Sequence, residues 1–173
     1  MDILPLIRRI PDYPSRGAVY YDLTTLLMDG AGFHALIDEF AARYRRLDIR
    51  KFVCMEWRGF VIGAALAYRL GAGFVPVRSL GALPGGTVSR AQNVGPVSER
   101  LQMSADAIAK GDRVVFVDDL LATGALSEAA LMLVKDTGAE VVECCYVQEI
   151  VELGGRKRLE KRGLSVFSFF EYL

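Results

Sequence analysis

Residues Val114 to Gly124 read VVFVDDLLATG, and this stretch decides the fold. Its first four residues are apolar and mostly β-branched, which is typical of a buried strand. Two aspartates follow, and a turn of small residues then leads into a helical pattern. Open α/β sheets bind their ligands at the carboxyl ends of their strands. The stretch therefore predicts an α/β protein with a ligand site where this strand ends.

Short β-type runs alternate with helical patterns on both sides of this stretch. The β-type runs lie at 51–55, 73–77, 113–117, 140–147 and 164–169. The helical patterns lie at 33–44, at 59–70 and after Gly124. Such alternation is typical of a doubly wound, mainly parallel sheet with helices on its faces. We expect a single domain over residues 1–173, because this length suits one core.

Two segments do not fit the alternation. Residues 10–25 (IPDYPSRGAVYYDLTT) contain prolines, a glycine and three tyrosines, which indicates an ordered hood outside the core. Residues 79–98 are rich in Gly, Pro, Ser and Asn. A loop of that length in a compact domain is typical of a mobile active-site flap or of disorder. We therefore expect a hood at about 10–25 and a flap at about 79–98.

Composition and charge narrow the possible partners. Lys plus Arg and Asp plus Glu number 21 each, so no net basic field favours nucleic acid. No apolar stretch is long enough for a membrane span, and early charges break the pattern of a secretory signal. The lack of a membrane span and of a secretory signal predicts a cytoplasmic protein. Cys54, Cys144 and Cys145 lie in apolar runs without metal-ligand spacing, so we expect buried free thiols.

The two aspartates and the small-residue turn carry the chemistry. Adjacent carboxylates repel each other unless a cation or hydroxyl groups lie against them, and a ribose diol with magnesium meets that need. The turn at Ala122, Thr123 and Gly124 runs into a helix whose free N–H groups and positive dipole end suit a phosphate. Each residue alone also fits a simple helix cap or turn. The combined string favours a ribose-phosphate site, and the lack of a GxxxxGK[ST] string argues against a P-loop nucleotidase.

The string VVFVDDLLATG resembles the phosphoribosyl-diphosphate loop of type I phosphoribosyltransferases, and LLATG is similar to the adenine phosphoribosyltransferase family in particular. Further segments resemble that family in order and spacing. They are IPDYPSRGAVYYDLTTLL in the hood, MEWRGFVIGAALAYRLGAGFVPVR around the pyrophosphate loop, GALPG at the flap and LGGRKRLEKRGLSVFS near the C-terminus. The resemblance covers nearly the whole chain. It implies the type I phosphoribosyltransferase fold and a homodimer.

The resemblance also implies an activity, in which the phosphoribosyl group of phosphoribosyl diphosphate passes to a purine nitrogen, by default of adenine, and pyrophosphate leaves. Such a reaction belongs to purine salvage. The implied cofactor is Mg²⁺, held mainly through the substrate diphosphate rather than by protein ligands. The implied catalytic residues are Asp118, Asp119, Arg58 and Arg78. The implied substrate-binding residues are Ala122, Thr123, Gly124, Val19, Tyr21 and Phe60, and further candidates beside these positions are Ala125, Ser127 and Trp57.

These residues have distinct implied roles. The aspartates hold the ribose hydroxyls, and the turn before the helix cradles the ribose phosphate. Arg58 and Arg78 meet the diphosphate with planar forks of donors. Val19 and Tyr21 line the base pocket, and Phe60 stacks on the base.

The chain departs from the family's pattern around the reacting centre. Where the family has RKxGKLP, this chain reads RSLGALP, so Ser79 and Ala82 replace lysines. Where the family has YxLEYG, residues 92–97 read QNVGPV and contain no carboxylate. The family's ATGGT becomes ATGAL, which puts Leu126 in place of a hydroxyl donor, and Trp57 replaces a small residue.

Three hypotheses therefore remain open. The first is an adenine-type phosphoribosyltransferase. The second is a phosphoribosyltransferase that acts on a different heterocyclic acceptor. The third is a non-catalytic regulatory derivative that binds a ribose phosphate. The flap separates them, because a protein that only binds has no need of the replaced lysines and glutamate.

Overall fold

The computed structural model describes residues 2–13, 15–94 and 97–173, without the side chains of 92–94 and 97–99. The chain divides into two compact units, Met1–Tyr44 and Arg45–Leu173. The single domain over 1–173 stays a prediction.

The N-terminal unit begins with a hairpin. A 3-10 helix, η1 (Leu4–Leu6), precedes β1 (Arg8–Pro11) and β2 (Val19–Asp22), which pair antiparallel. The helices α1 (Thr24–Met28) and α2 (Gly30–Tyr44) follow. The side chains of Leu36, Ile37, Phe40 and Tyr44 are buried along one face of α2, as the helical spacing predicts. The expected hood residues thus form a strand pair and the start of a helix.

Asp22 ties the hairpin to the start of α1. Its carboxylate accepts a hydrogen bond from the Arg8 guanidinium at 2.6 Å and another from the Thr24 N–H at 2.9 Å. The hydrogen bonding of Thr24, followed by that of Arg8, lowers the pKa of Asp22 from 3.8 to about 2.

We predict that acid loosens this hairpin. Because the folded pKa lies below the unfolded value, the carboxylate stabilises the fold above about pH 4 by roughly 2 kcal/mol. That stabilisation is lost as the pH falls toward 2. Amide protection factors across Arg8–Asp22, measured by hydrogen exchange, should fall over this range. In Asp22→Asn they should be low already at pH 5, and equal pH profiles in the two proteins would contradict the prediction.

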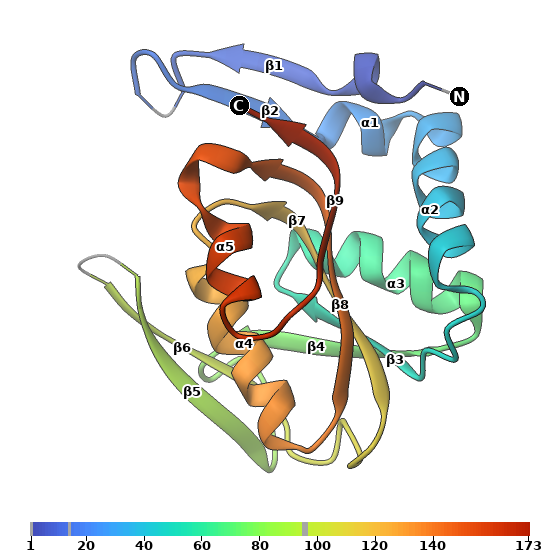
Figure 1. Cartoon of the computed structure of the whole chain (residues 1–173), viewed down its shortest axis with the longest axis vertical. Coiled ribbons are helices and arrows are strands. Elements are labelled where there is room, and N and C mark those ends of the chain that lie inside the picture. The colour runs from blue at the N-terminus through green and yellow to red at the C-terminus, as the bar shows by residue number, and fades with distance from the viewer. Residues whose placement is uncertain (1, 14, 95–96) are drawn as a thin grey trace. The chain divides into compact units, whose positions relative to one another are not determined.

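Seven strands of the second unit, as far as the chain is described, form one sheet in the order β5-β6-β4-β3-β7-β8-β9 (Figure 1). Their bounds are β3 (Lys51–Met55), β4 (Gly73–Ser79), β5 (Thr87–Val94), β6 (Val97–Ser104), β7 (Arg113–Leu121), β8 (Glu140–Ile150) and β9 (Val166–Tyr172). The pairs β3–β4, β3–β7, β7–β8 and β8–β9 are parallel. The pairs β4–β6 and β5–β6 are antiparallel. The mainly parallel sheet is confirmed.

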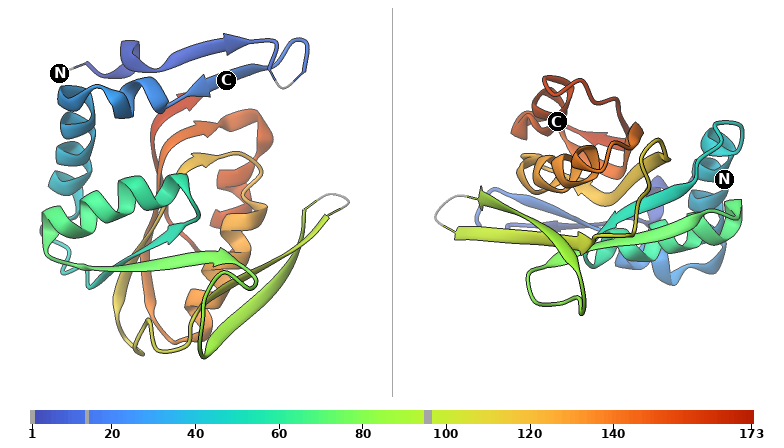
Figure 2. Two further views of the ribbon diagram at one scale, coloured as in Figure 1. Left: turned by 180° about the vertical axis from the view of Figure 1, so that it is seen from behind. Right: turned by 90° about the horizontal axis from the view of Figure 1, so that it is seen from below.

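Helices cover both faces of this sheet. Helix α3 (Arg58–Leu70) packs on β3 and β7, while α4 (Ala125–Asp136) and α5 (Gly155–Glu160) lie on the other face (Figure 2). A short 3-10 helix, η2 (Val151–Leu153), precedes α5, and neither was expected from the sequence. The apolar run of β7 from Val114 to Val117 is fully buried between these layers. The doubly wound α/β architecture is therefore confirmed.

Two further expectations concern the cysteines and membrane-spanning helices. Cys54, Cys144 and Cys145 are buried thiols, as predicted. Throughout the described ranges, every helix is too short or too polar to span a bilayer.

The expected flap contains more regular structure than the sequence predicts. Instead of a loop, β5 and β6 pair antiparallel from Thr87↔Ser104 to Val94↔Val97, and β6 also pairs with β4. The loop prediction was wrong because polar and small residues can form a strand when a neighbouring strand satisfies their backbone groups. Gly95 and Pro96 lie outside the described residues, as do the side chains of the QNVGPV segment. The mobility of this segment stays a prediction.

Candidate active site

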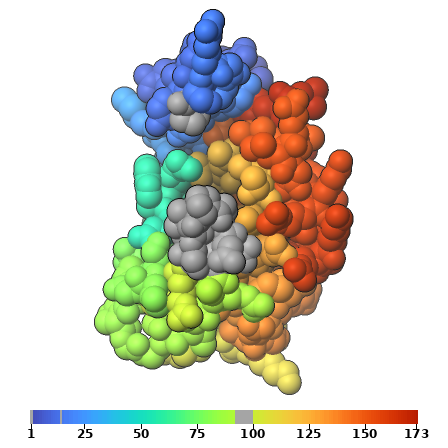
Figure 3. Space-filling model, turned by 90° about the vertical axis from the view of Figure 1, so that its left-hand side faces the viewer, coloured from blue at the N-terminus to red at the C-terminus, as the bar shows by residue number. Residues whose placement is uncertain are grey.

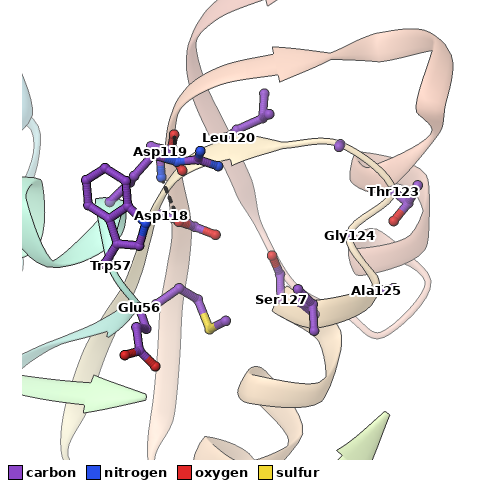
Figure 4. A pocket seen from close by; sticks show the side chains of 13 residues that line it. Glu56, Trp57, Asp118, Asp119, Leu120, Thr123, Gly124, Ala125 and Ser127 are labelled. Carbon is purple, nitrogen blue, oxygen red and sulfur yellow. Dashed lines mark hydrogen bonds and ion pairs between the residues drawn. The ribbon is translucent and has the colours of Figure 1, made fainter. Parts of the chain in front are cut away.

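A pocket of about 300 Å³ lies at the carboxyl ends of β3 and β7 (Figure 4). Because these strands are parallel neighbours, their ends lie at the same edge of the sheet. The pocket is lined by Met55, Glu56, Trp57, Arg58, Asp118, Asp119, Leu120, Ala122, Thr123, Gly124, Ala125, Leu126 and Ser127. In Figure 3 the gold surface at the end of β7 lies between the turquoise start of α3 and the orange to red C-terminal elements. This is the edge at which open α/β sheets bind ligands.

The two aspartates lie inside β7, because the strand continues to Leu121. The expectation that the strand ends before them was wrong, since β8 is long enough to pair with β7 beyond Asp118. Side chains alternate between the faces of a strand. Accordingly, Asp118 points toward Ser127 of α4, and Asp119 lies on the side of Trp57 (Figure 4). The two carboxylates therefore approach the pocket from different directions.

The Arg58 guanidinium pairs with Asp119, and its charge also acts on Asp118. Its Nε lies 2.6 Å from Oδ2 of Asp119, whose side chain is almost fully buried. Asp118 accepts a hydrogen bond of 2.9 Å from the N–H of Asp119. Burial, and then the charge of Asp119, raises the pKa of Asp118 well above its ordinary value. The pair therefore favours a ligand that brings hydroxyl groups or positive charge to it.

Trp57 precedes α3 at the mouth of the pocket. Its side chain is 66% exposed, and the Arg58 guanidinium lies 5.9 Å from its ring centre. At that distance the ring face attracts the cation. An indole exposed at a pocket is available to a ligand, and it helps to hold Arg58 beside the pocket.

Arg78 reaches the pocket only through Glu56. It donates to Glu56 Oε1 from Nη2 at 2.9 Å and from Nε at 3.2 Å, and to the Ala82 carbonyl at 3.2 Å. The N–H of Ser79 donates to Glu56 Oε2 at 3.0 Å. The Ser79 N–H, and then Arg78, lowers the pKa of Glu56. Glu56 was not among the predicted site residues, although its position directly after β3 was the signal that could have found it.

The turn after β7 presents hydrogen-bond donors to the pocket. Gly124 adopts φ +70° as the N-cap of α4, a left-handed conformation that favours glycine. The first N–H groups of a helix have no partner within the helix, and the dipole there is positive. The hydroxyl-bearing residues Thr123 and Ser127 line the same pocket. Together these groups form a cradle for an anion such as a phosphate.

Three predicted residues lie elsewhere in the chain. Val19 and Tyr21 belong to β2 of the N-terminal unit. Phe60 lies on α3, where its ring makes an edge contact with that of Phe74 at 5.4 Å. Their roles in base binding stay predictions. The other predicted residues, Arg78 excepted, line the one pocket just described.

Known proteins resemble the chain over its full length. The phosphoribosyl transferase domain family matches residues 26–169. The adenine phosphoribosyltransferase of Nitrosospira multiformis is 49% identical, over 99% of this chain and 98% of that protein. That of Nitrosomonas europaea is 45% identical over 99% of both.

Solved structures agree with these relatives. The adenine phosphoribosyltransferase of Thermoanaerobacter pseudethanolicus superposes with a TM-score of 0.91 at 39% identity, over 98% of each chain. The enzyme of Saccharomyces cerevisiae, in complex with adenine and an imino-altritol bisphosphate, also gives a TM-score of 0.91, at 33% identity over 96% of each chain.

Proposed function

Since this chain belongs to the adenine phosphoribosyltransferase family, we propose that it transfers the phosphoribosyl group of phosphoribosyl diphosphate to adenine and releases pyrophosphate. The observation that carries the proposal is a single pocket in which an acidic pair meets an anion cradle. A different acceptor and a purely regulatory role are less favoured, because the full-length relatives are named as adenine enzymes.

The cradle suits the ribose phosphate. The N–H groups at the start of α4 and the hydroxyls of Thr123 and Ser127 can each donate to a phosphate oxygen. Ala122, Gly124 and Ala125 present only small side chains, so the backbone can approach the anion closely.

The acidic pair suits the ribose hydroxyls. Burial disfavours the charged form of Asp118, so this carboxylate gains a partner when a ribose hydroxyl donates to it. Asp119, which pairs with Arg58, can accept a hydrogen bond from the other hydroxyl. Mg²⁺ prefers oxygen ligands, and the diphosphate and hydroxyl oxygens of the substrate would hold it beside these acidic residues. When bound, Mg²⁺ would neutralise charge on the diphosphate and ease its departure.

Arg58 suits the diphosphate. Its guanidinium offers a planar fork of donors, of which Nε is directed at Asp119. A diphosphate in the pocket would compete with Asp119 for this cation. Arg78 would contribute indirectly. Its hydrogen bonds to Glu56 hold the start of the flap against the pocket wall. These residues position the reactants and stabilise the leaving group, with no protein nucleophile.

The base site and the assembly rest on the family resemblance. We assign adenine binding to Val19, Tyr21 and Phe60, which supply apolar and aromatic surface. We further propose a homodimer in the cytoplasm, which takes part in purine salvage. Sedimentation of the purified protein measures whether it is a dimer.

We predict that Trp57 reports ligand binding. It is the single tryptophan of the chain, and it lines the pocket beside Arg58. Titration with phosphoribosyl diphosphate and Mg²⁺ should therefore change its fluorescence in a saturable way, with little response to Mg²⁺ alone. Unchanged emission at concentrations that saturate turnover would show that the ligand binds elsewhere.

A panel of bases tests the proposed reaction. The protein is incubated with Mg²⁺, phosphoribosyl diphosphate and adenine, hypoxanthine, guanine or a pyrimidine, and released pyrophosphate is measured. We expect adenine to give the highest rate. A higher rate with another base would favour the second hypothesis, and binding without release from any base would favour the regulatory one.

A further inference from the structure

A buried hydroxyl behind the pocket has no partner in the described part of the chain. Tyr146 of β8 is fully buried, and its Oη makes no hydrogen bond there. Buried polar groups are nearly always hydrogen-bonded, because an unmade bond costs free energy that phenylalanine would avoid. The hydroxyl of Tyr146 therefore requires an explanation.

The position of Tyr146 relates this hydroxyl to the ligand pocket. In the parallel ladder, Tyr146 lies opposite Asp118 and so shares its face of the sheet. Its ring belongs to the apolar cluster under α4 and lies 6.1 Å from that of Phe116. Burial raises the pKa of the phenol, and the charge of Asp118 raises it further. The side chain of Ser127 lies close enough to the phenol to lower that pKa, although the two hydroxyls do not form a well-oriented hydrogen bond. Both residues also line the pocket, so the phenol lies directly behind its wall.

Ser127 is the link between the phenol and the pocket. It lies in the first turn of α4, and only 5% of its surface is exposed. A serine hydroxyl has one proton and two acceptor positions. In a helix that proton can instead turn back to the carbonyl four residues earlier, here that of Thr123. If a second group donates a hydrogen bond to the serine oxygen, the serine's own proton is directed toward the ligand.

We propose that Tyr146 is a positioning residue, whose hydroxyl donates to Ser127 Oγ when a phosphate is bound and so directs the serine proton to a phosphate oxygen. The inference rests on the proposed function, because it takes the ligand to be a phosphorylated ribose. Consecutive hydrogen bonds polarise one another in a buried setting, so the pair binds the anion better than Ser127 alone. The unpaired phenol thus destabilises the ligand-free protein only.

Tyr146→Phe separates this role from simple core packing, because it removes one oxygen and keeps the ring. We expect an unchanged or higher melting temperature, since an unpaired buried hydroxyl is deleted. The KM for phosphoribosyl diphosphate should rise about 5- to 10-fold, with kcat changed less than about twofold. Tyr68→Phe on α3, at a 92% exposed side chain, is the matched control and should change neither value.

A double-mutant cycle completes the test. Ser127→Ala should raise the same KM, and Tyr146→Phe should add little in its presence, because both changes disrupt one chain of bonds. Independent effects that multiply, or an unchanged KM in Tyr146→Phe, would overturn the inference.

Ribose 5-phosphate binding, measured by calorimetry, separates this inference from the proposed reaction. Weaker binding by Tyr146→Phe supports the inference even if no transfer occurs. If the wild-type protein binds neither ribose 5-phosphate nor phosphoribosyl diphosphate, the proposed function fails and the inference fails with it.

Discussion

Asp118→Asn combined with Asp119→Asn is expected to lower kcat/KM for phosphoribosyl diphosphate by a factor of about 10² to 10⁴. Each hydrogen bond to a charged group is worth roughly 1.5–3 kcal/mol, and every 1.36 kcal/mol changes a rate tenfold. The double change removes both carboxylates that we assign to the ribose hydroxyls. It also removes the negative partner of Arg58, which lies 2.6 Å from Asp119. Steady-state kinetics with adenine and Mg²⁺ measures the loss.

The single variants should differ in stability. Burial disfavours the charged form of Asp118, so Asp118→Asn should unfold at or above the wild-type temperature. Asp119→Asn leaves Arg58 without its carboxylate partner and should lower that temperature slightly. The matched control is Asp106→Asn, an exposed carboxylate outside the pocket, which should be neutral. If the double variant turned over at the control's rate, the site assignment would be wrong.

Gly155→Ala is expected to damage both stability and phosphate binding. Gly155, at the start of α5, packs directly under the turn that leads into α4. A Cβ added there would overlap the Ala122 carbonyl oxygen and would lie 2.7 Å from Cδ1 of Leu121. No backbone carbonyl tolerates that approach, so the turn must move. Forced repacking of this kind costs about 1–3 kcal/mol, and the moved N–H groups should weaken phosphate binding by about tenfold or more.

Thermal unfolding and calorimetric titration with ribose 5-phosphate measure these two effects. Gly30→Ala is the control, because a Cβ added there meets nothing within 4 Å. Gly155→Ala with wild-type affinity for ribose 5-phosphate would mean that the turn at 122–124 does not hold the phosphate.

Most of the second unit could be predicted from the sequence because its strands are buried on both faces. Such strands are continuous apolar runs, as at Val114–Val117, and the alternation with helices fixes a parallel order. The hairpin of β5 and β6 was missed because its residues carry no apolar run. Its strands depend on pairing with each other and with β4, a property of the whole sheet.

The site was predictable where one short segment supplies it. The Asp118–Ser127 side of the pocket is contiguous in the sequence, and the resemblance added Arg58. The extent of β7 was not predictable, because two aspartates interrupt its apolar run and the residues after them pair with a strand about thirty residues later. Glu56 and Tyr146 were missed for a related reason. Their neighbours, Arg78 and Ser127, are distant in the sequence and become adjacent only through the strand order.

The most direct test of the central claim is the product balance of a single reaction. Purified protein, adenine, phosphoribosyl diphosphate and Mg²⁺ are mixed, and the purine nucleotide and pyrophosphate are quantified together. We predict adenosine monophosphate and pyrophosphate in a one-to-one ratio, formed at an enzymatic rate that Asp118→Asn with Asp119→Asn abolishes. Binding of phosphoribosyl diphosphate with no nucleotide formed from adenine would contradict the account.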